Sequence, residues 1–188
     1  MRRILIATAA VLLAASPLAA CKKAGGADTG PAALAKAETS AKAWMANNAK
    51  QPGVVSLPSG LQYKVLASGP ATGAHPRPQD QIKIQYEGKL TTGLVFDSSM
   101  EEGVPRVFRL GDLIPGWIAG IQLMRPGDDW ILYLPPELGY GPDPSSHGGD
   151  QIPPNAVLIF RIQLLDSLPG IEASPAPSPA SAPIAAPK

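Results

Sequence analysis

The 188-residue sequence contains one cysteine and two histidines, and each scarcity excludes a class of chemistry. A single thiol cannot form an internal disulfide. His75 and His147 lie at metal-ligand spacing neither with each other nor with the cysteine, and no Gly-x-Ser-x-Gly or phosphate-binding glycine motif occurs. A nucleophile assisted by a general base has no obvious candidate. We therefore predict that any reaction here needs no metal, cofactor, proton shuttle or covalent intermediate.

An excess of either charge is also lacking. Lys and Arg number 16 against 15 Asp and Glu, a net charge of +1, and no basic stripe or acidic block interrupts the chain. A nucleic-acid partner is therefore not expected.

Residues 1–20 have the composition of an export signal. Two arginines precede the apolar run ILIATAAVLLAA, and small residues follow at positions 19 and 20. The run is too short for a stable membrane-spanning helix. We therefore predict that residues 1–20 are a signal peptide.

The cysteine, Cys21, follows this signal directly. The residues LAAC at 18–21 resemble the bacterial lipobox, in which the chain is cut before the cysteine and the thiol is acylated. The resemblance implies a protein held at a bacterial envelope membrane by more than one acyl chain, which is enough for stable anchoring. Lys22 at the next position favours the outer membrane, with the domain facing the periplasm or the surface. The competing interpretation is a cysteine present by chance or paired with another molecule.

Composition divides the rest of the chain into four segments. A small, polar, glycine-containing stretch is typical of a tether, and helix-forming Ala, Lys, Glu, Leu and Met follow it. Alternating strand patterns come next, and the chain then alternates Pro with Ala and Ser, which favours extended, unpaired backbone. We predict a flexible tether at 21–30, an amphipathic helix and linker at 31–56, a folded domain at 57–168 and a disordered tail at 169–188.

The helix is expected to run from Pro31 to Gln51, between a proline suited to a first turn and a Pro-Gly pair that ends it. This pattern predicts a helix that docks on the domain or lies free. Self-association is the alternative, which leaves a monomer and a weak homodimer both open, although about twenty residues make only a small dimer surface. The apolar side chains on one helical face are Leu34, Ala37, Ala41, Trp44 and Met45.

The segment 57–168 alternates apolar and polar residues, which is the period of a β-strand with one buried face. The alternating stretches are LQYKVL, QIKIQYEGKL, RVFRL and AVLIFRIQLL. In the first stretch, Gln62 falls on the polar face and Val65 on the apolar face. The second strand is expected to end at Tyr86, just before a Glu-Gly pair.

Two stretches depart from this alternation. WILYLP, at 130–135, is apolar throughout, which predicts a central strand covered on both sides. PGWIAGIQLM has a helical period instead, with Trp117, Ile121 and Met124 on one face. We therefore predict an α+β fold in which an antiparallel sheet packs one short helix on a single face.

Four stretches of this domain resemble those of a known family in their residues and in their order along the chain. They are YEGKLTTGLVFDSS, IPGWIAGIQLMRPGD, LYLPPELGYG and IPPNAVLIFRIQLL. They closely resemble the FKBP-type peptidyl-prolyl cis-trans isomerases, in particular the bacterial envelope branch related to macrophage infectivity potentiators. The resemblance covers about residues 57–168. It implies a β-sheet half-barrel wrapped around one short α-helix, with an apolar pocket between them.

The resemblance also implies which residues form that pocket. Trp117 would be the floor on which a proline ring rests, and Tyr140 would donate a phenolic hydrogen bond to the substrate. Asp97 would accept a hydrogen bond from Tyr86 within the wall.

Substrate carbonyls would be bound by two backbone N–H groups, those of Ile114 and Ile152. His147 would lie in a loop that overhangs the rim. The residues carried over as catalytic are Tyr86, Asp97, Trp117, Tyr140 and Phe160, and those carried over as substrate-binding are Phe96, Phe108, Ile114, His147 and Ile152.

The sequence departs from the family pattern at the rim. Arg106 stands where many relatives have an aromatic or aliphatic wall residue. The stretch GPDPSSHGGDQ, at 141–151, is longer than the equivalent loop of minimal members, and its Gln151 replaces an apolar residue. These differences leave the chemistry unchanged and bear on substrate preference and on affinity for macrolide inhibitors.

We therefore expect a peptidyl-prolyl cis-trans isomerase that assists the folding of exported proteins, with proline-containing polypeptides as substrates. The alternative is a non-catalytic, peptide-binding chaperone lipoprotein that uses the same pocket for capture. A third interpretation is a structural surface lipoprotein whose proline-rich tail contacts the cell wall.

Overall fold

The computed structural model describes residues 30–144 and 151–170. The predictions for the signal peptide, for Cys21 and its tether, for His147 and for the tail after residue 170 lie outside the described residues. The helices are α1 (Pro31–Asn48), α2 (Ser99–Glu102) and α3 (Pro115–Ile121), with 3-10 turns η1 (Leu110–Asp112) and η2 (Pro136–Leu138). The strands are β1 (Val54–Ser56), β2 (Gln62–Ala67), β3 (Gln81–Leu90), β4 (Val95–Ser98), β5 (Arg106–Arg109), β6 (Asp129–Leu134) and β7 (Leu158–Leu168).

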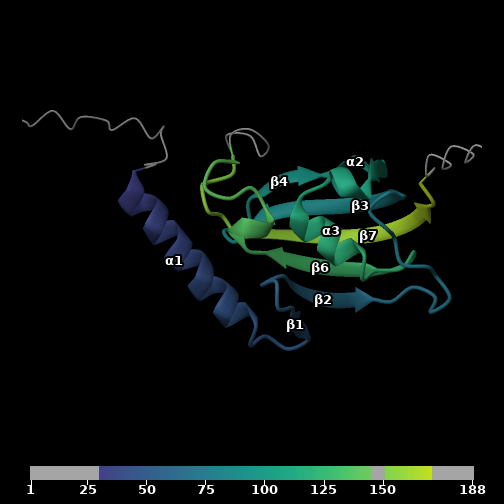
Figure 1. Ribbon diagram of the computed structural model, residues 1–188, viewed down its shortest axis with the longest axis horizontal. Coiled ribbons are helices and arrows are strands. Elements are labelled where there is room, and N and C mark those ends of the chain that lie inside the picture. The colour runs from purple at the N-terminus through teal and green to yellow at the C-terminus, as the bar shows by residue number, and fades with distance from the viewer. Residues whose placement is uncertain (1–29, 145–150, 171–188) are drawn as a thin grey trace, which may run out of the picture.

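These strands form one antiparallel sheet in the order β1-β2-β6-β7-β3-β4, with β5 also paired to β3 (Figure 1). β3 and β7 are the longest strands and pair from Gln81 opposite Leu168 to Leu90 opposite Leu158. β4 and β5 share the outer edge of β3, one at each end of it. The predicted α+β class and antiparallel half-barrel are therefore confirmed.

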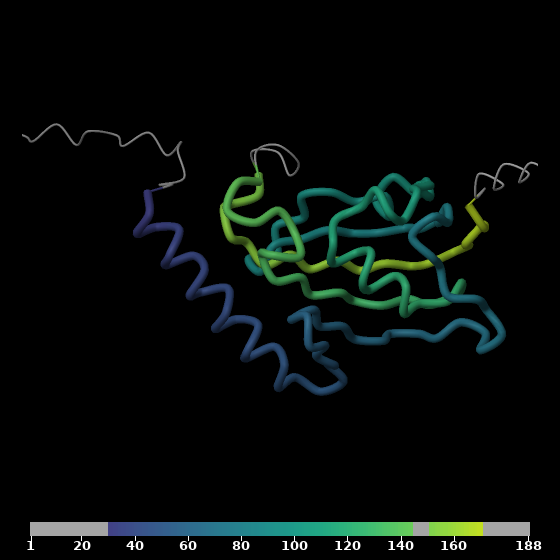
Figure 2. Tube along the Cα trace, viewed as in Figure 1, coloured from purple at the N-terminus to yellow at the C-terminus, as the bar shows by residue number. Residues whose placement is uncertain are grey.

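The short helix α3 lies against one face of this sheet (Figure 2). Pro115 supplies the first turn, where its missing N–H costs nothing. The helix approaches β6 so closely that a Cβ at Gly116 would lie 2.4 Å from Leu134, and one at Gly120 would lie 2.5 Å from Leu132. Two glycines spaced by one helical turn thus seat α3 on the sheet. The side chains buried between the two include Trp117, Ile121, Met124, Leu132, Leu134, Phe160 and Ile162.

The N-terminal helix α1 docks on the domain by its predicted apolar face (Figure 1). Ala41 and Met45 are buried and pack with Val157, while the Trp44 ring lies 5.9 Å from the ring of Tyr133. The other two members of the face, Leu34 and Ala37, are half-buried. The helix ends at residue 48, three residues earlier than expected. Docking is the interpretation that this packing supports, and self-association stays a prediction.

One polar residue of β2 is buried, contrary to the alternating pattern. Gln62 is 6% exposed, whereas Val65, expected on the apolar face, is 41% exposed. The cause is α1, which covers this side of the strand. The Gln62 Nε2 donates to the Met45 carbonyl at 2.9 Å, and its Oε1 accepts from Asn48 Nδ2 at 2.9 Å. A buried amide is stable here because both of its ends are hydrogen-bonded.

Two other expectations about strands were wrong. β3 does not end at Tyr86 but continues to Leu90. Gly88 does not mark a strand end: a Cβ there would lie within 2.8 Å of the rings of Phe96 and Phe160, so only glycine fits beneath them. β6 is buried on one face, not on both: its alternate residues are half-exposed. Over the described residues, none of the helices has the length and the apolar character that crossing a membrane requires.

Candidate functional site

A cavity of about 180 Å³ opens between α3 and the strands β3, β4, β5 and β7. This volume is below the range of pockets for drug-sized ligands, so it suits a single small ring or side chain. Aromatic side chains from α3, from each of these four strands and from the segment after η2 supply most of its wall. The lining residues are Tyr86, Phe96, Asp97, Phe108, Leu113, Ile114, Trp117, Tyr140 and Phe160.

Trp117, in the first turn of α3, is 5% exposed and lines this cavity. Its ring meets Phe160 edge-on, with centroids 5.0 Å apart and planes at 88°. It meets Tyr86 at 5.1 Å and 76°, and Phe108 at 6.3 Å and 79°. These edge-to-face contacts are the favoured geometry for aromatic pairs. The cage fixes the indole in place and leaves an apolar surface for a ligand.

The indole N–H of Trp117 is buried without a hydrogen-bond partner among the described residues. A buried donor without an acceptor costs free energy and is uncommon in native proteins. Phe96, on the edge strand β4, completes the cage by packing edge-on to Phe160 at 5.6 Å. The aromatic surface thus extends from the helix to the edge of the sheet.

A hydrogen bond between two side chains lies in the cavity wall. The Tyr86 hydroxyl donates to Asp97 Oδ2 at 2.7 Å, and the Tyr86 backbone N–H donates to Ser99 Oγ at 2.9 Å. Burial, the hydrogen bond to Asp97 and the charge of Asp97 all raise the pKa of Tyr86 well above its ordinary value. Burial and the same carboxylate also raise the pKa of Tyr140. Both phenols therefore stay protonated at neutral pH and act as hydrogen-bond donors, not as bases.

The departure at Arg106 lies at the edge of this site. Its guanidinium forms a 2.5 Å ion pair with Glu102, and both side chains are about half exposed. Arg106 does not line the cavity, although its positive charge partly offsets the rise in the pKa of Tyr86. An exposed pair of this kind contributes little to stability. It places one charge of each sign near a cavity whose lining already holds the carboxylate of Asp97.

The cavity brings together eight of the ten residues that the resemblance implied. Ile152 is the ninth: it is 4% exposed and packs in the same core cluster without lining the cavity. His147 lies outside the described residues. Leu113 lines the cavity and was missed, although its place next to Ile114, just before the proline that starts α3, could have indicated it.

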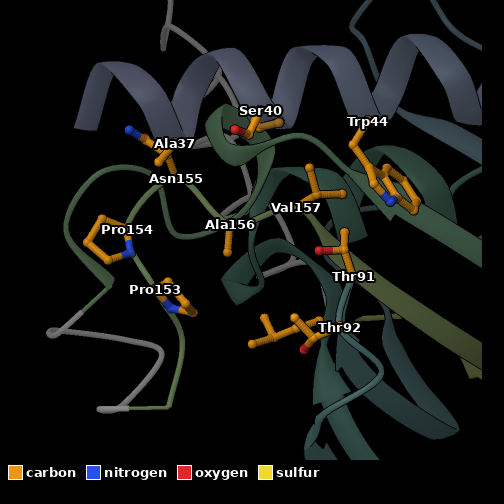
Figure 3. Close-up of a pocket in the computed structure, with 12 residues that line it drawn as sticks. Ala37, Ser40, Trp44, Thr91, Thr92, Pro153, Pro154, Asn155, Ala156 and Val157 are labelled. Atoms are coloured by element: carbon orange, nitrogen blue, oxygen red, sulfur yellow. The ribbon is translucent and has the colours of Figure 1, made fainter. Parts of the chain in front are cut away.

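A second hollow, of about 280 Å³, runs along α1 (Figure 3). Trp44 and Ser40 lie on its α1 side, the loop at 153–157 forms the opposite side, and Thr91 and Thr92 close it below. This groove is apolar, but of the aromatic side chains only Trp44 lines it. It lacks the cage of rings and the hydrogen-bonded acid of the cavity beside α3, which is therefore the better candidate site. Among residues 30–144 and 151–170, no three His, Cys, Asp or Glu side chains cluster as metal ligands would.

Fold and cavity together define a class of protein: a half-barrel domain that closes an antiparallel sheet over one helix and offers a small, ring-walled cavity with phenolic donors. A family model described as FKBP-type peptidyl-prolyl cis-trans isomerase matches residues 73–165. A second model, described as the domain amino terminal to FKBP-type peptidyl-prolyl isomerase, matches residues 18–65.

Individual relatives agree with these matches. The chain is 48% identical over 122 residues to the FKBP-type peptidyl-prolyl cis-trans isomerase FkpA of Aeromonas hydrophila, covering 65% of this chain and 43% of the relative. It is 45% identical over 123 residues to the outer membrane protein MIP of Legionella longbeachae, covering 65% and 51%. The crystal structure of a peptidyl-prolyl cis-trans isomerase from Pseudomonas syringae is similar with a TM-score of 0.64 and 32% identity, covering 72% of this chain and 96% of that one.

The chain belongs to the FKBP-type peptidyl-prolyl cis-trans isomerase family. It spans about half the length of the curated relatives it matches.

Proposed function

We propose that this protein is a peptidyl-prolyl cis-trans isomerase that acts on exported polypeptides. The observation that carries the proposal is the caged Trp117 in the lining of a small, largely apolar cavity whose wall holds the Tyr86–Asp97 hydrogen bond. Membership of the isomerase family supports the same reaction.

The reaction needs only a site that binds one shape of the substrate better than the others. Amide resonance makes rotation about an X-Pro bond slow, with a barrier of about 18–20 kcal/mol. At the transition state the bond is twisted, resonance is lost and the charge separation of the planar amide shrinks. An apolar cavity disfavours the charge-separated planar form, and this preference for the twisted form is catalysis. A barrier lower by about 7–8 kcal/mol would give an acceleration of about 10⁵.

The cavity residues divide these tasks among them. The proline ring rests on Trp117 inside the aromatic cage, which excludes water. Tyr140, kept protonated by burial, donates to a carbonyl next to the twisted bond. The backbone N–H groups of Ile114, which caps α3, and of Ile152 hold the flanking chain. Asp97 acts through Tyr86, by fixing the orientation of that ring and hydroxyl.

A non-catalytic peptide-binding chaperone is the second candidate. The specific observation in its favour is the apolar groove along α1, which offers a second surface for an unfolded chain. Suppression of client aggregation by a variant without isomerase activity would favour this candidate over the enzyme.

We propose that the lipid anchor at Cys21 holds the domain at the bacterial envelope. The LAAC sequence supports this, and one relative carries the name outer membrane protein. A diacylglyceryl group and an amide-linked chain would supply the two or more tails that stable anchoring needs. Mass spectrometry of the mature protein would detect the acyl chains, and Cys21→Ser should release the protein into the soluble fraction. A Cys21→Ser variant that stays in the membrane fraction would contradict the anchor.

A coupled peptide assay tests the enzymatic proposal directly. The purified protein should accelerate cis-trans isomerisation of a proline-containing peptide, and a macrolide of the rapamycin class should suppress the acceleration by occupying the cavity. A rate equal to that of buffer alone would overturn the proposal.

A further inference from the structure

The chain leaves the described part of the fold at a fixed point beside β3. The Gly170 backbone N–H donates to Asp80 Oδ1 at 3.0 Å, and Asp80 Oδ2 accepts from the Arg77 backbone N–H at 2.8 Å. A Cβ at position 170 would lie 1.9 Å from the Gln79 carbonyl oxygen, so only glycine fits. Residues 171–188 therefore start from a pinned backbone.

One side of the isomerase cavity is near this exit point, whereas Phe160 in its opposite wall lies eight residues before Leu168, about 26 Å back along β7. The Asp80 carbonyl accepts from the Leu110 backbone N–H at 3.0 Å, and Leu110 begins η1. The two residues that follow η1, Leu113 and Ile114, line the cavity. Since consecutive Cα atoms are 3.8 Å apart, Leu113 lies at most about 11 Å from Leu110. The groove along α1 is lined by Val157, just before the start of β7, and so lies farther along this strand from Gly170 than Phe160 does (Figure 1).

The segment that starts at this exit point is rich in the bonds that the cavity suits. Each of its prolines follows Ser or Ala: Pro175, Pro177, Pro179, Pro183 and Pro187. The first lies five residues past Gly170, a reach of about 17 Å that covers the near side of the cavity but not its Phe160 wall. Pro183, 13 residues past Gly170, has a reach of about 44 Å. Later prolines have slack to spare. Pro175, Pro177 and Pro179 have small residues on both sides, which present little bulk to a cavity of about 180 Å³, whereas Pro183 and Pro187 have a small residue only before them.

We propose that an X-Pro bond of residues 174–187 occupies the cavity beside α3, so that the chain carries its own ligand. The binding step needs only the cavity and the exit geometry. Isomerisation of this X-Pro bond by the same chain rests on the proposed isomerase function. The tail would then compete with external substrates and raise their apparent KM, without changing kcat.

The size of the effect follows from the tether. A short flexible linker holds its ligand at an effective concentration of the order of mM. A tail that binds with millimolar affinity would fill about half of the cavities, so removing the prolines should lower the apparent KM by about twofold. A tail that binds tenfold more tightly would change KM by about tenfold.

Indole N–H signals in nuclear magnetic resonance spectra of the full chain test occupancy without any assay of activity. The three tryptophans provide internal controls, because Trp117 lines the cavity while Trp44 and Trp130 do not. The variant replaces all five tail prolines by Ala, which keeps length and charge. We expect the Trp117 signal to move and the other two to stay. An unmoved Trp117 signal, or a moved Trp44 signal that places the tail in the groove along α1, would overturn the proposal.

Two further measurements separate this proposal from its neighbours. Diluting the full chain should leave the Trp117 signal unchanged, and a signal that moves on dilution would mean that another molecule's tail is bound, which contradicts docking in cis. In the peptide assay, the Pro→Ala variant should show the lower KM at equal kcat. A moved Trp117 signal in a protein without isomerase activity would support the docked tail and defeat the enzymatic proposal. If the protein is active but the Pro→Ala variant has the same KM and the same Trp117 signal as the parent, the enzymatic proposal is supported and the docked tail is overturned.

Discussion

The Tyr86 hydroxyl donates to Asp97 Oδ2 at 2.7 Å across the pairing of β3 with β4. The two residues come from adjacent strands, and their pairing aims a carboxylate at a phenol inside an aromatic wall. The raised pKa of Tyr86 keeps this hydroxyl protonated at neutral pH. We therefore expect the site to bind a substrate by its shape and its hydrogen-bond donors.

Tyr86→Phe removes this hydrogen bond and keeps the ring that packs on Trp117. We expect kcat/KM to fall by about tenfold, equivalent to about 1.4 kcal/mol of transition-state binding, because the wall loses its fixed orientation. The matched control is Tyr63→Phe on β2, whose ring stacks on Trp130 away from the cavity. The coupled peptide assay measures both. Equal losses in the two variants would show that the hydroxyl of Tyr86 has no special role.

Trp117→Phe replaces the indole in the cavity lining by a smaller ring. Trp130→Phe makes the same change at a buried tryptophan that does not line the cavity. Both variants should lose about 1–3 kcal/mol of stability to urea, because both leave unfilled core volume. Only the first should lose activity, by about tenfold or more in kcat/KM. If Trp130→Phe matches that loss, the effect comes from general destabilisation and the floor role is wrong.

The raised pKa values of Tyr86 and Tyr140 predict how activity depends on alkaline pH. Burial and the Asp97 charge keep both hydroxyls protonated beyond the ordinary phenol pKa of about 10. The isomerase rate should therefore be constant from pH 7 to about 10. Stability should fall above that pH, because unfolding lets buried phenols ionise and the unfolded chain then releases protons. A rate that falls with a midpoint well below pH 10 would contradict protonated donors.

Asp80 predicts a loss of stability in acid. Hydrogen bonds from the backbone N–H groups of Arg77 and Gly170 lower the pKa of its carboxyl below the ordinary value. A lowered folded-state pKa contributes stability that is present above the unfolded pKa, about 3.9, and lost as the pH falls through the folded value. Asp80→Asn should therefore lower the urea midpoint at pH 7 and flatten its decline in acid. A variant with the same acid limb as the parent protein would show that Asp80 does not set it.

The periodicity of apolar residues correctly predicted the sheet, the helix α3 and the apolar face of α1, because each pattern reports which side of an element is buried. It did not predict the one-turn helix α2. The same reasoning was wrong at Gln62, where a polar residue is buried. The polar face of β2 is covered by α1, a contact between segments that no local period encodes. Likewise, Gly88 signals a strand end until the rings of Phe96 and Phe160 are known to lie over it.

The cavity residues could be named only through the family resemblance. Composition shows ten aromatic residues but not that six of them line one cavity, since they lie as far apart in sequence as Tyr86 and Phe160. Leu113 was predicted neither from residue patterns nor from the family resemblance. It resembles an ordinary apolar residue before a helix, and only the fold turns it toward the cavity.

Gln62→Ala separates the docking of α1 from the chemistry of the cavity. Its side chain joins the Met45 carbonyl and the Asn48 amide to β2, so its loss removes two hydrogen bonds, at a cost of about 1–3 kcal/mol. The Met45 carbonyl keeps the hydrogen bond from the Ala49 backbone N–H. We expect faster hydrogen exchange across α1 and an unchanged kcat/KM, because Gln62 does not line the cavity. Gln81→Ala, at an exposed position of β3, is the matched control and should change neither quantity. Faster exchange in α1 together with a large loss of activity would instead mean that the docked helix supports the cavity, and the separation of the two would be wrong.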